Sequence, residues 1–270
     1  MPVTKKYSYI LAKLILFSRM QKISDVLIRL NEIVKQCESS KNRVGYFAAL
    51  YKRMTLSVAE GIAAGKFENG ARMEQLDIVF AQRYLDAYGA YHAGKPCSIS
   101  WQSAFGACSD TSLIVLQQLM IGINTHINLD LAIAAATVAP GSGIHALQND
   151  FNRINNVISS LVDDVQESLT QVWWPMRFLS KIANGKQEAV LNFSIDKARA
   201  ASWANAVLLA NMNEPQRFFY IKQMDTTVKQ LGDGIRYPGG FTKYILKAIR
   251  KTEYEDIART TRLINTTVVG

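Results

Sequence analysis

One stretch combines the longest apolar run of the chain with polar side chains in its middle. It is SLIVLQQLMIGINTHINLDLAIAAATVA, residues 112–139. Alanine, leucine, isoleucine and methionine dominate it and no proline occurs before Pro140, so the pattern predicts one long helix over 112–138. At about 100° per residue, His126 and Asp130 lie one turn apart on one face of this helix. The amides on nearly the opposite face are Gln117, Asn124 and Asn128.

A helix that is apolar nearly all round either lies in a large core or crosses a membrane. An aspartate, a histidine and several amides would be costly in hydrocarbon, and no second run of similar length is present to pair with it. The pattern therefore favours a buried central helix, whose polar side chains find partners inside the protein.

The remaining periodic stretches also favour helices. Five of the six prolines fall between them, and no alternating run of β-branched residues is long enough for a sheet. Because no repeat, low-complexity tract or linker divides the chain, the sequence predicts an all-α fold, a single-domain bundle over 1–270 around the central helix. The expected helices cover 21–37, 43–64, 71–92, 99–108, 112–138, 145–171, 177–184, 195–212, 216–231 and 241–262.

Composition narrows the class of protein. Hydrophobic residues make up 49% of the chain and the mean hydropathy is +0.00, as in globular proteins. The three cysteines, an odd number without CxxC spacing, exclude a disulfide framework and fit a reducing compartment. The apolar stretch 7–18 is interrupted by Lys13 and no small-residue cleavage site follows it, so we expect a retained amphipathic segment and a cytoplasmic protein.

The net charge of +9 is concentrated at the two ends. Residues 1–53 hold eleven Lys or Arg against three Asp or Glu, and residues 240–270 hold six against three. The basic N-terminal segment 1–20 and the basic helix 241–262 are either solvated faces or a patch for an anionic membrane, nucleic acid or acidic partner. No nucleic-acid-binding motif is present, so a nucleic-acid partner is not expected and peripheral membrane contact is the alternative to plain solubility.

The helix over 71–92 carries acids and tyrosines along one seam. Glu74, Asp77, Tyr84 and Tyr88 follow the spacing of one helix face. Two interpretations stay open. Either the rings pack while the acids pair with arginines such as Arg72, or both carboxylates point into a cavity.

The helix over 145–171 has an apolar stripe that Asp150 borders. Its acidic run, residues 163–167, has the outline of a DDxxE diphosphate-binding motif, but short acidic runs on helices are usually solvated. Asp150 is therefore the residue of this helix that we expect to reach a site.

No P-loop, dinucleotide fingerprint, HExxH, EF-hand or GxSxG motif occurs. The remaining candidate is a cluster of His126 and Asp130 with Glu74 and Asp77. An imidazole and a carboxylate at i and i+4 can both reach one divalent metal ion, with acids of a second helix completing the site. Without a metal, Asp130 could orient His126 as a base, or the pair could be a structural hydrogen bond between buried groups.

Several of these segments together resemble a known family. Residues 50–88 (LYKRMTLSVAEGIAAGKFENGARMEQLDIVFAQRYLDAY), residues 122–136 (GINTHINLDLAIAAA) and the DFNRIN that starts at Asp150 are similar to the family called domain of unknown function 5995. The resemblance spans most of residues 45–210 and implies one all-α domain without assigning an activity. The spacing of His126 and Asp130 is also similar to a ligand pair in the all-α zinc phospholipase C and P1 nuclease group, but three histidines are too few for that group's site.

The leading functional hypothesis is an intracellular enzyme with an enclosed apolar pocket for a small, lipid- or terpenoid-like molecule. It would be a hydrolase or a lyase or cyclase, metal-dependent or not, and a non-catalytic carrier of an apolar ligand is the alternative. A purely structural role of the polar cluster is the third hypothesis. The expected catalytic or metal-binding residues are His126, Asp130, Glu74 and Asp77, and the expected substrate-binding residues are Tyr84, Tyr88, Asn124, Asn128 and Asp150.

Overall fold

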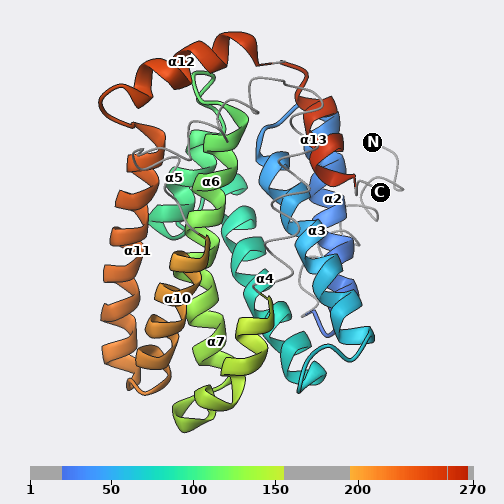
Figure 1. The fold of residues 1–270 in the computed structure, drawn as a ribbon, viewed down its shortest axis with the longest axis vertical. Coiled ribbons are helices and arrows are strands. Elements are labelled where there is room, and N and C mark those ends of the chain that lie inside the picture. Colours follow the sequence, from blue (N-terminus) through green and yellow to red (C-terminus); the bar gives the residue numbers. More distant parts are fainter. Residues whose placement is uncertain (1–19, 155–194, 254, 267–270) are drawn as a thin grey trace, which may run out of the picture.

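The computed structural model describes residues 20–154, 195–253 and 255–266. In these ranges it contains helices and no strand. The predicted all-α fold is confirmed (Figure 1). The helices are α2 (Ile23–Ser39), α3 (Val44–Ala63), α4 (Gly70–His92), α5 (Ile99–Ala107), α6 (Val115–Thr125), η1 (His126–Leu131), α7 (Ala132–Val138), η2 (Gly141–Gly143), α10 (Ile195–Ala210), α11 (Glu214–Arg236), α12 (Thr242–Thr252) and α13 (Ile257–Asn265), with a further helical stretch over 144–154.

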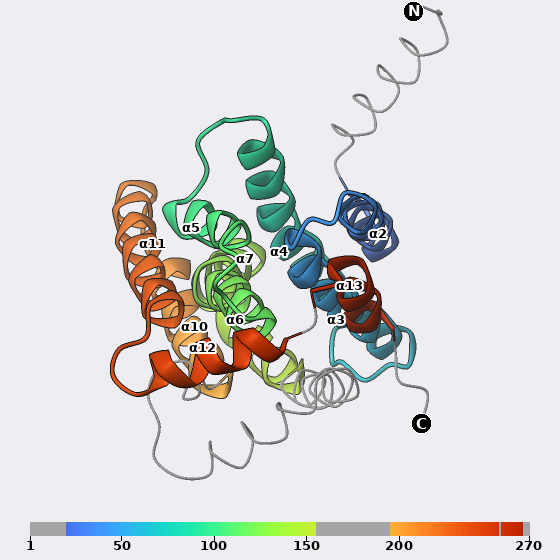
Figure 2. The ribbon, with the colours of Figure 1, turned by 90° about the horizontal axis from the view of Figure 1, so that it is seen from above.

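The central helix runs through α6, η1 and α7 without a break and lies in the middle of the bundle. Helices α3 and α4 flank it on one side and α10 and α11 on the other (Figures 1 and 2). Within the described residues, Val115–Val138 alone is long and apolar enough to cross a membrane, but 89% of its most apolar window is buried inside the bundle. The packing therefore agrees with the expected core helix, which begins at Val115 instead of residue 112.

The middle of this helix departs from α geometry. Residues His126–Leu131, the HINLDL segment, form a turn of π-helix, and all six side chains are buried. Single π turns within α-helices cost hydrogen-bond geometry and occur often at functional sites. The irregular turn thus coincides with the histidine and the aspartate that the sequence singles out.

The prediction of one continuous basic helix over 241–262 is wrong. This segment is divided into α12 and α13, because a carboxylate oxygen of Glu253 accepts from the backbone N–H of Val115 at 2.9 Å, and Asp256 caps the first turn of α13. The chain therefore turns between these two helices, next to the start of α6. The predicted segment 1–20, the helix 177–184 and the acidic run 163–167 lie outside the described residues, apart from Met20 at the end of the first.

The apolar side chains form two clusters that meet at three shared residues. One cluster contains side chains of α2, α3, α5 and α6, and the other contains side chains of α7, the stretch 144–154, α10 and the first half of α11. The side chains that pack against both are Met54, Phe80 and Ile123. Division into a single domain stays a prediction.

Candidate functional site

A cavity of about 70 Å³ lies where the two apolar clusters meet, and Met54, Phe80 and Ile123 all line it. This volume is several times the space that one water molecule needs, roughly 10–15 Å³ on the same kind of measure, so a small ligand fits. Helix α3 supplies more of the lining than the other helices, because its residues from Phe47 to Val58 that face the cavity follow the i, i+3, i+4, i+7 spacing of one helix face. The lining residues are Phe47, Leu50, Tyr51, Met54, Thr55, Val58, Met73, Leu76, Asp77, Phe80, Ile123, His126, Ile127, Leu131, Ile154, Ile195 and Arg199.

The imidazole of His126 is held from behind by Asp130. Nδ1 of His126 lies 3.0 Å from one carboxylate oxygen of Asp130, which also accepts from Nε1 of Trp101 at 2.7 Å. The other oxygen accepts from Nε of Arg83 at 2.9 Å. Because a carboxylate only accepts, these contacts keep the proton of a neutral imidazole on Nδ1, so Nε2 presents its lone pair. The predicted pair is thus formed, with a tryptophan and an arginine that the sequence did not single out.

Aromatic rings enclose the imidazole. The ring of Phe80 stacks on it with centroids 3.6 Å apart and 9° between the planes, and the Tyr51 ring meets its edge at 4.4 Å. Burial lowers the pKa of His126, and the hydrogen bond from Nδ1 to Asp130 opposes this effect without overcoming it. The imidazole is therefore neutral near pH 7, in the form that can accept a proton at Nε2.

In the part of the chain that the structure describes, four polar atoms on cavity-lining side chains are buried without a hydrogen bond of good geometry. They are the Tyr51 hydroxyl, Oγ1 of Thr55, Oδ2 of Asp77 and Nε2 of His126. Buried polar atoms are almost always satisfied in proteins, and each one left alone costs about 1–3 kcal/mol. Their common location in an otherwise apolar cavity is the pattern expected of groups that meet a polar atom of a ligand or water there.

Asp77 is the acid of this cluster. Burial raises its pKa to about 8, and the nearby Glu74 carboxylate adds to the effect. At neutral pH most Asp77 side chains therefore carry a proton and can donate a hydrogen bond. Burial also raises the pKa of Tyr51 well above its ordinary value, with contributions from the charges of Asp77 and Asp130, so Tyr51 remains a neutral hydroxyl.

Arg199 of α10 closes another part of the cavity. Its Nη2 donates to the carbonyl of Phe151 at 2.6 Å, and the guanidinium lies 4.5 Å from the centre of the Phe151 ring. Burial lowers its pKa to about 10, so it is still charged at neutral pH. A cation and a neutral acid thus line the same cavity.

Glu74 does not join the site. Its carboxylate accepts from the backbone N–H of Ile23 at 3.0 Å, the first residue of α2, where a negative charge also complements the helix dipole. Asp77, three residues later, is rotated by about 60° around α4 and reaches the cavity. Of the two acids that one interpretation places in a shared cavity, Asp77 lines it and Glu74 does not.

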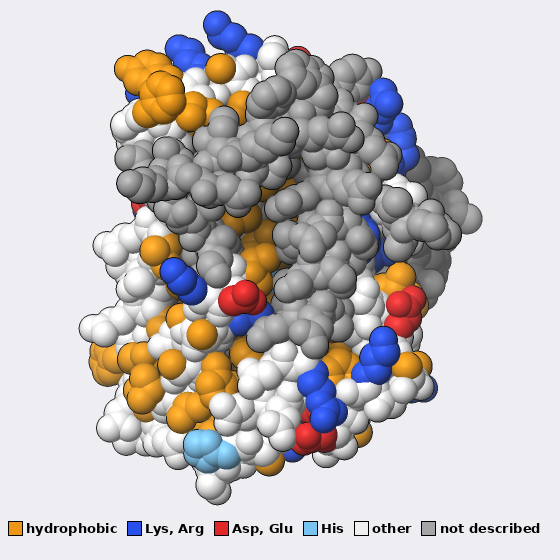
Figure 3. All heavy atoms as spheres, viewed as in Figure 1, with side chains coloured by type: hydrophobic (Ala, Val, Ile, Leu, Met, Phe, Trp, Pro, Cys, Tyr) orange, Lys and Arg blue, Asp and Glu red, His pale blue; other side chains and the backbone are white. Residues whose placement is uncertain are grey.

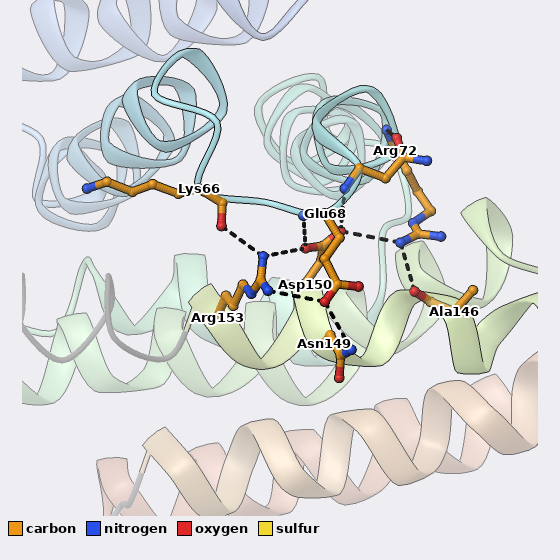
Figure 4. Close-up of polar contacts among 8 residues, drawn as sticks. Lys66, Glu68, Arg72, Ala146, Asn149, Asp150 and Arg153 are labelled. Carbon is orange, nitrogen blue, oxygen red and sulfur yellow. Dashed lines mark hydrogen bonds and ion pairs between the residues drawn. The ribbon is translucent and has the colours of Figure 1, made fainter.

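Asp150 is also outside the cavity and has a structural role (Figure 4). Its two oxygens accept from the backbone N–H groups of Glu68 at 2.7 Å and Asn69 at 3.0 Å, immediately before α4. Arg72 lies 3.3 Å from the same carboxylate and ties it to α4. Asp150, expected to bind substrate, instead anchors the start of α4, the helix that carries Asp77.

The predicted metal site is not assembled in the part of the chain that the structure describes. No three His, Cys, Asp or Glu side chains there come close enough to hold a metal ion. Of the four expected ligands, Asp130 accepts from Nδ1 of His126, Asp77 lines the cavity and Glu74 caps α2.

The other expected binding residues also lie outside the cavity. Tyr84 is fully buried among Phe47, Trp101 and His126, and Tyr88 packs on Phe105. The two amides form a link to α11, in which Asn128 donates to Asn124 and Asn124 donates to the carbonyl of Val228, both within about 3.0 Å. They hold the opposite face of the central helix, as its sequence pattern predicts.

Three polar lining residues were missed from the sequence, namely Tyr51, Thr55 and Arg199. A signal exists for the first two, because they interrupt the apolar stripe of α3 at i and i+4. Arg199 similarly interrupts a buried stripe of small residues in α10. A polar residue inside an apolar helix face is the same signal that singles out His126 and Asp130.

Comparison with known proteins gives a family and no closer relative. No curated protein and no solved structure matches the chain. The model of a family of unknown function, DUF5995, matches residues 23–238, which include every residue that lines the cavity. The match covers well over half of the chain, and the protein therefore belongs to the DUF5995 family.

Proposed function

We propose that this protein is an enzyme that transfers protons on a small, mostly hydrocarbon molecule held in the cavity, with His126 as the base and Asp77 as the acid. The observation that carries the proposal is the state of His126, which lines the cavity. Its Nε2 is buried and has no hydrogen-bond partner among the described residues, while Asp130 holds Nδ1. A base that is neutral near pH 7 and fixed in one tautomer is suited to accept a proton from a bound molecule.

Asp77 supports the second half of the proposal. A carboxyl group with a pKa near 8 is protonated at neutral pH and can donate to a carbonyl or hydroxyl oxygen as charge develops there. Groups whose surroundings push their pKa values toward opposite protonation states are typical of acid–base sites. The hydroxyls of Tyr51 and Thr55 are available to bind the same polar group.

The rest of the cavity wall supports an apolar body for the substrate. Side chains of leucine, isoleucine, methionine, valine and phenylalanine line it, so a hydrocarbon chain or ring of a lipid- or terpenoid-like molecule gains by burial. The reaction class that agrees with a base and an acid in a mostly apolar cavity is isomerisation or elimination, the latter a lyase reaction.

A non-catalytic carrier is the second candidate, and the same apolar wall favours it. A carrier needs the cavity and a polar anchor, but it does not need a base that is oriented by a carboxylate. The oriented imidazole is therefore the observation that ranks the enzyme first.

Short-chain 2-alkanones test both candidates in one experiment, because they combine a small apolar body with a carbonyl and exchangeable C–H bonds. Binding is measured by calorimetry, and proton transfer by mass spectrometry of deuterium taken up next to the carbonyl in D₂O. The enzyme moves a C–H proton to Nε2 while Asp77 protonates the carbonyl oxygen, so exchange should exceed that in buffer and should be lost in His126→Gln with binding retained.

The other outcomes separate the candidates. Binding without accelerated exchange would overturn the enzyme and leave the carrier. Absence of binding by the alkanones and by the matching alkanols and alkanoic acids would overturn both. Asp86→Asn, an exposed position on the same helix as Asp77, is the control and should change neither quantity.

A further inference from the structure

A second feature of the molecule is unrelated to the cavity and lies at the C-terminal end of α11. Where α11 leads into α12, the large side chains Tyr237, Phe241 and Tyr244 are 64%, 70% and 69% exposed. In Figure 3, hydrophobic side chains gather at the upper left corner, directly beside Lys and Arg side chains; Figure 1 places the connection between α11 and α12 at this corner. We call this surface, which also includes Lys243, Lys247 and Lys251, the α12 surface.

The helix itself separates its side chains by type. Thr242, Leu246 and Ile249 are buried against the bundle. Lys243, Lys247 and Lys251 recur every four residues and are all exposed. Helix α12 is thus already packed on its inner side, and what it presents outward is a row of cations next to aromatic rings.

The lysines differ from the arginines around them in their pairing. Arg236, the last residue of α11, lies 3.1 Å from Asp110. Arg250 lies 2.9 Å from Glu255 and donates to the carbonyl of Thr111 at 2.7 Å, so these two cations attach the end of α11 and α12 to the segment before α6. In the ranges that the structure describes, none of the three lysines makes an ion pair. Their charge is therefore available to an external partner.

A groove beside the helix adds a recess to this charged surface. Its volume is about 520 Å³, and it lies between α12 and the residues that lead into α6. The cations that line it are Arg236, Lys243, Lys247, Arg250 and Lys251, and no acidic residue among those that the structure describes lines it. An anionic group that enters the groove meets a positive field from several directions.

We propose that the α12 surface docks on an anionic phospholipid bilayer. Lysines attract the negative surface of such a bilayer, while exposed Phe and Tyr side chains insert at the level of the headgroups, where one end of a ring is apolar and the other is wet. Nucleic acid would account for the lysines, but it gives no reason for a phenylalanine that is 70% exposed beside them. The groove provides space for a phosphate headgroup.

Vesicle co-sedimentation with the full chain tests the proposal. Vesicles of phosphatidylcholine are compared with vesicles that contain phosphatidylglycerol, at low and at high salt. A lysine near an anionic bilayer contributes about fivefold to partitioning, so Lys243→Glu, Lys247→Glu and Lys251→Glu together should weaken binding by about a hundredfold or more. The control carries Lys35→Glu, Lys66→Glu and Lys95→Glu, three exposed lysines on other elements, and should bind within a few-fold of the wild type.

The aromatic side chains are tested by Phe241→Ser with Tyr244→Ser, which should weaken binding to anionic vesicles at both salt concentrations. All variants should keep the wild-type circular dichroism, because every substituted side chain is exposed. Equal binding to neutral vesicles, no binding of the wild type to anionic ones, or equal loss in the control would each overturn the proposal. Displacement from vesicles by a DNA duplex or by inorganic phosphate, with no difference between lipids, would assign the surface to those ligands instead.

Discussion

Nδ1 of His126 donates to a carboxylate oxygen of Asp130 across 3.0 Å, and both side chains are almost completely buried. The carboxylate is not reserved for the histidine, because Trp101 and Arg83 donate to it as well. Three elements, namely α4, α5 and the π turn, therefore meet at one carboxylate. The consequence is that the orientation of the imidazole is fixed by the tertiary structure and not only by its own helix.

Asp130→Asn should be strongly destabilising. The amide replaces one acceptor by a donor group, which leaves a donor of Arg83, Trp101 or His126 facing another donor. Breaking such a buried network typically costs about 3–5 kcal/mol of the free energy of unfolding, measurable by urea denaturation. Asp86→Asn, which removes an exposed carboxylate of α4, should change it by less than about 0.5 kcal/mol. Similar effects of the two variants would show that the network contributes little.

The fold was largely readable from the sequence because helical periodicity and prolines mark most of its elements. The central helix is the best example, since its apolar run predicted burial and its two polar faces have separate partners, α11 for Asn124 and α4 with α5 for Asp130. The break between α12 and α13 was not readable, because it depends on a contact between Glu253 and Val115, which are far apart in the sequence.

The site was readable only in part. Periodicity places Glu74 and Asp77 on one side of α4, but a rotation of about 60° decides that one caps α2 and the other reaches the cavity. Whether a buried acid such as Asp150 serves a ligand or a backbone depends on what lies opposite to it, which no local pattern records. Tyr51 and Thr55 became candidates only because both line the cavity and their hydroxyls make no hydrogen bond of good geometry among the described residues.

Asp77 should make stability depend on pH in a specific direction. Its pKa is about 8 in the folded protein and ordinarily 3.8, so its contribution is fully present below about pH 4 and is lost as pH rises toward 8. Asp77→Asn cannot ionise and should escape this loss. The stability of the variant relative to the wild type should therefore rise by at least about 2 kcal/mol between about pH 4.5 and pH 8.5, because one pKa unit corresponds to about 1.4 kcal/mol. The measurement is urea denaturation of both proteins at the two pH values. The same difference in free energy of unfolding between variant and wild type at both values would contradict the raised pKa.

Asp150→Asn should loosen the start of α4. The amide can accept from only one of the backbone N–H groups of Glu68 and Asn69, and it leaves Arg72 without its charge partner. We expect a loss of about 2–4 kcal/mol in the free energy of unfolding and faster hydrogen exchange at both N–H groups. Asn149→Ala, at the exposed neighbour whose amide donates to the Glu68 side chain at 3.1 Å, is the control and should cost less than about 1 kcal/mol. Unchanged hydrogen exchange in Asp150→Asn would exclude the role of Asp150 as the anchor of the start of α4 (Figure 4).

Gly122→Ala should affect both stability and the cavity, because an added Cβ would lie 2.7 Å from the ring of Phe47, a lining residue that also meets the edge of His126. The side of the helix that the glycine leaves open is thus filled by this ring. Accommodating the methyl group requires the ring to move, at a cost of about 1–3 kcal/mol in a packed core. Gly89→Ala is the matched control in α4. Apart from its own stretch of helix, no atom of the described residues lies within 4 Å of the added Cβ, so this alanine should stabilise by about 0.5–1 kcal/mol. Thermal unfolding separates the signs of the two effects, and calorimetry with a 2-alkanone should show weaker binding for the first variant alone. Equal stabilisation by both alanines would mean that Phe47 moves freely, and the wall of the cavity would then be less rigid than proton transfer at His126 requires.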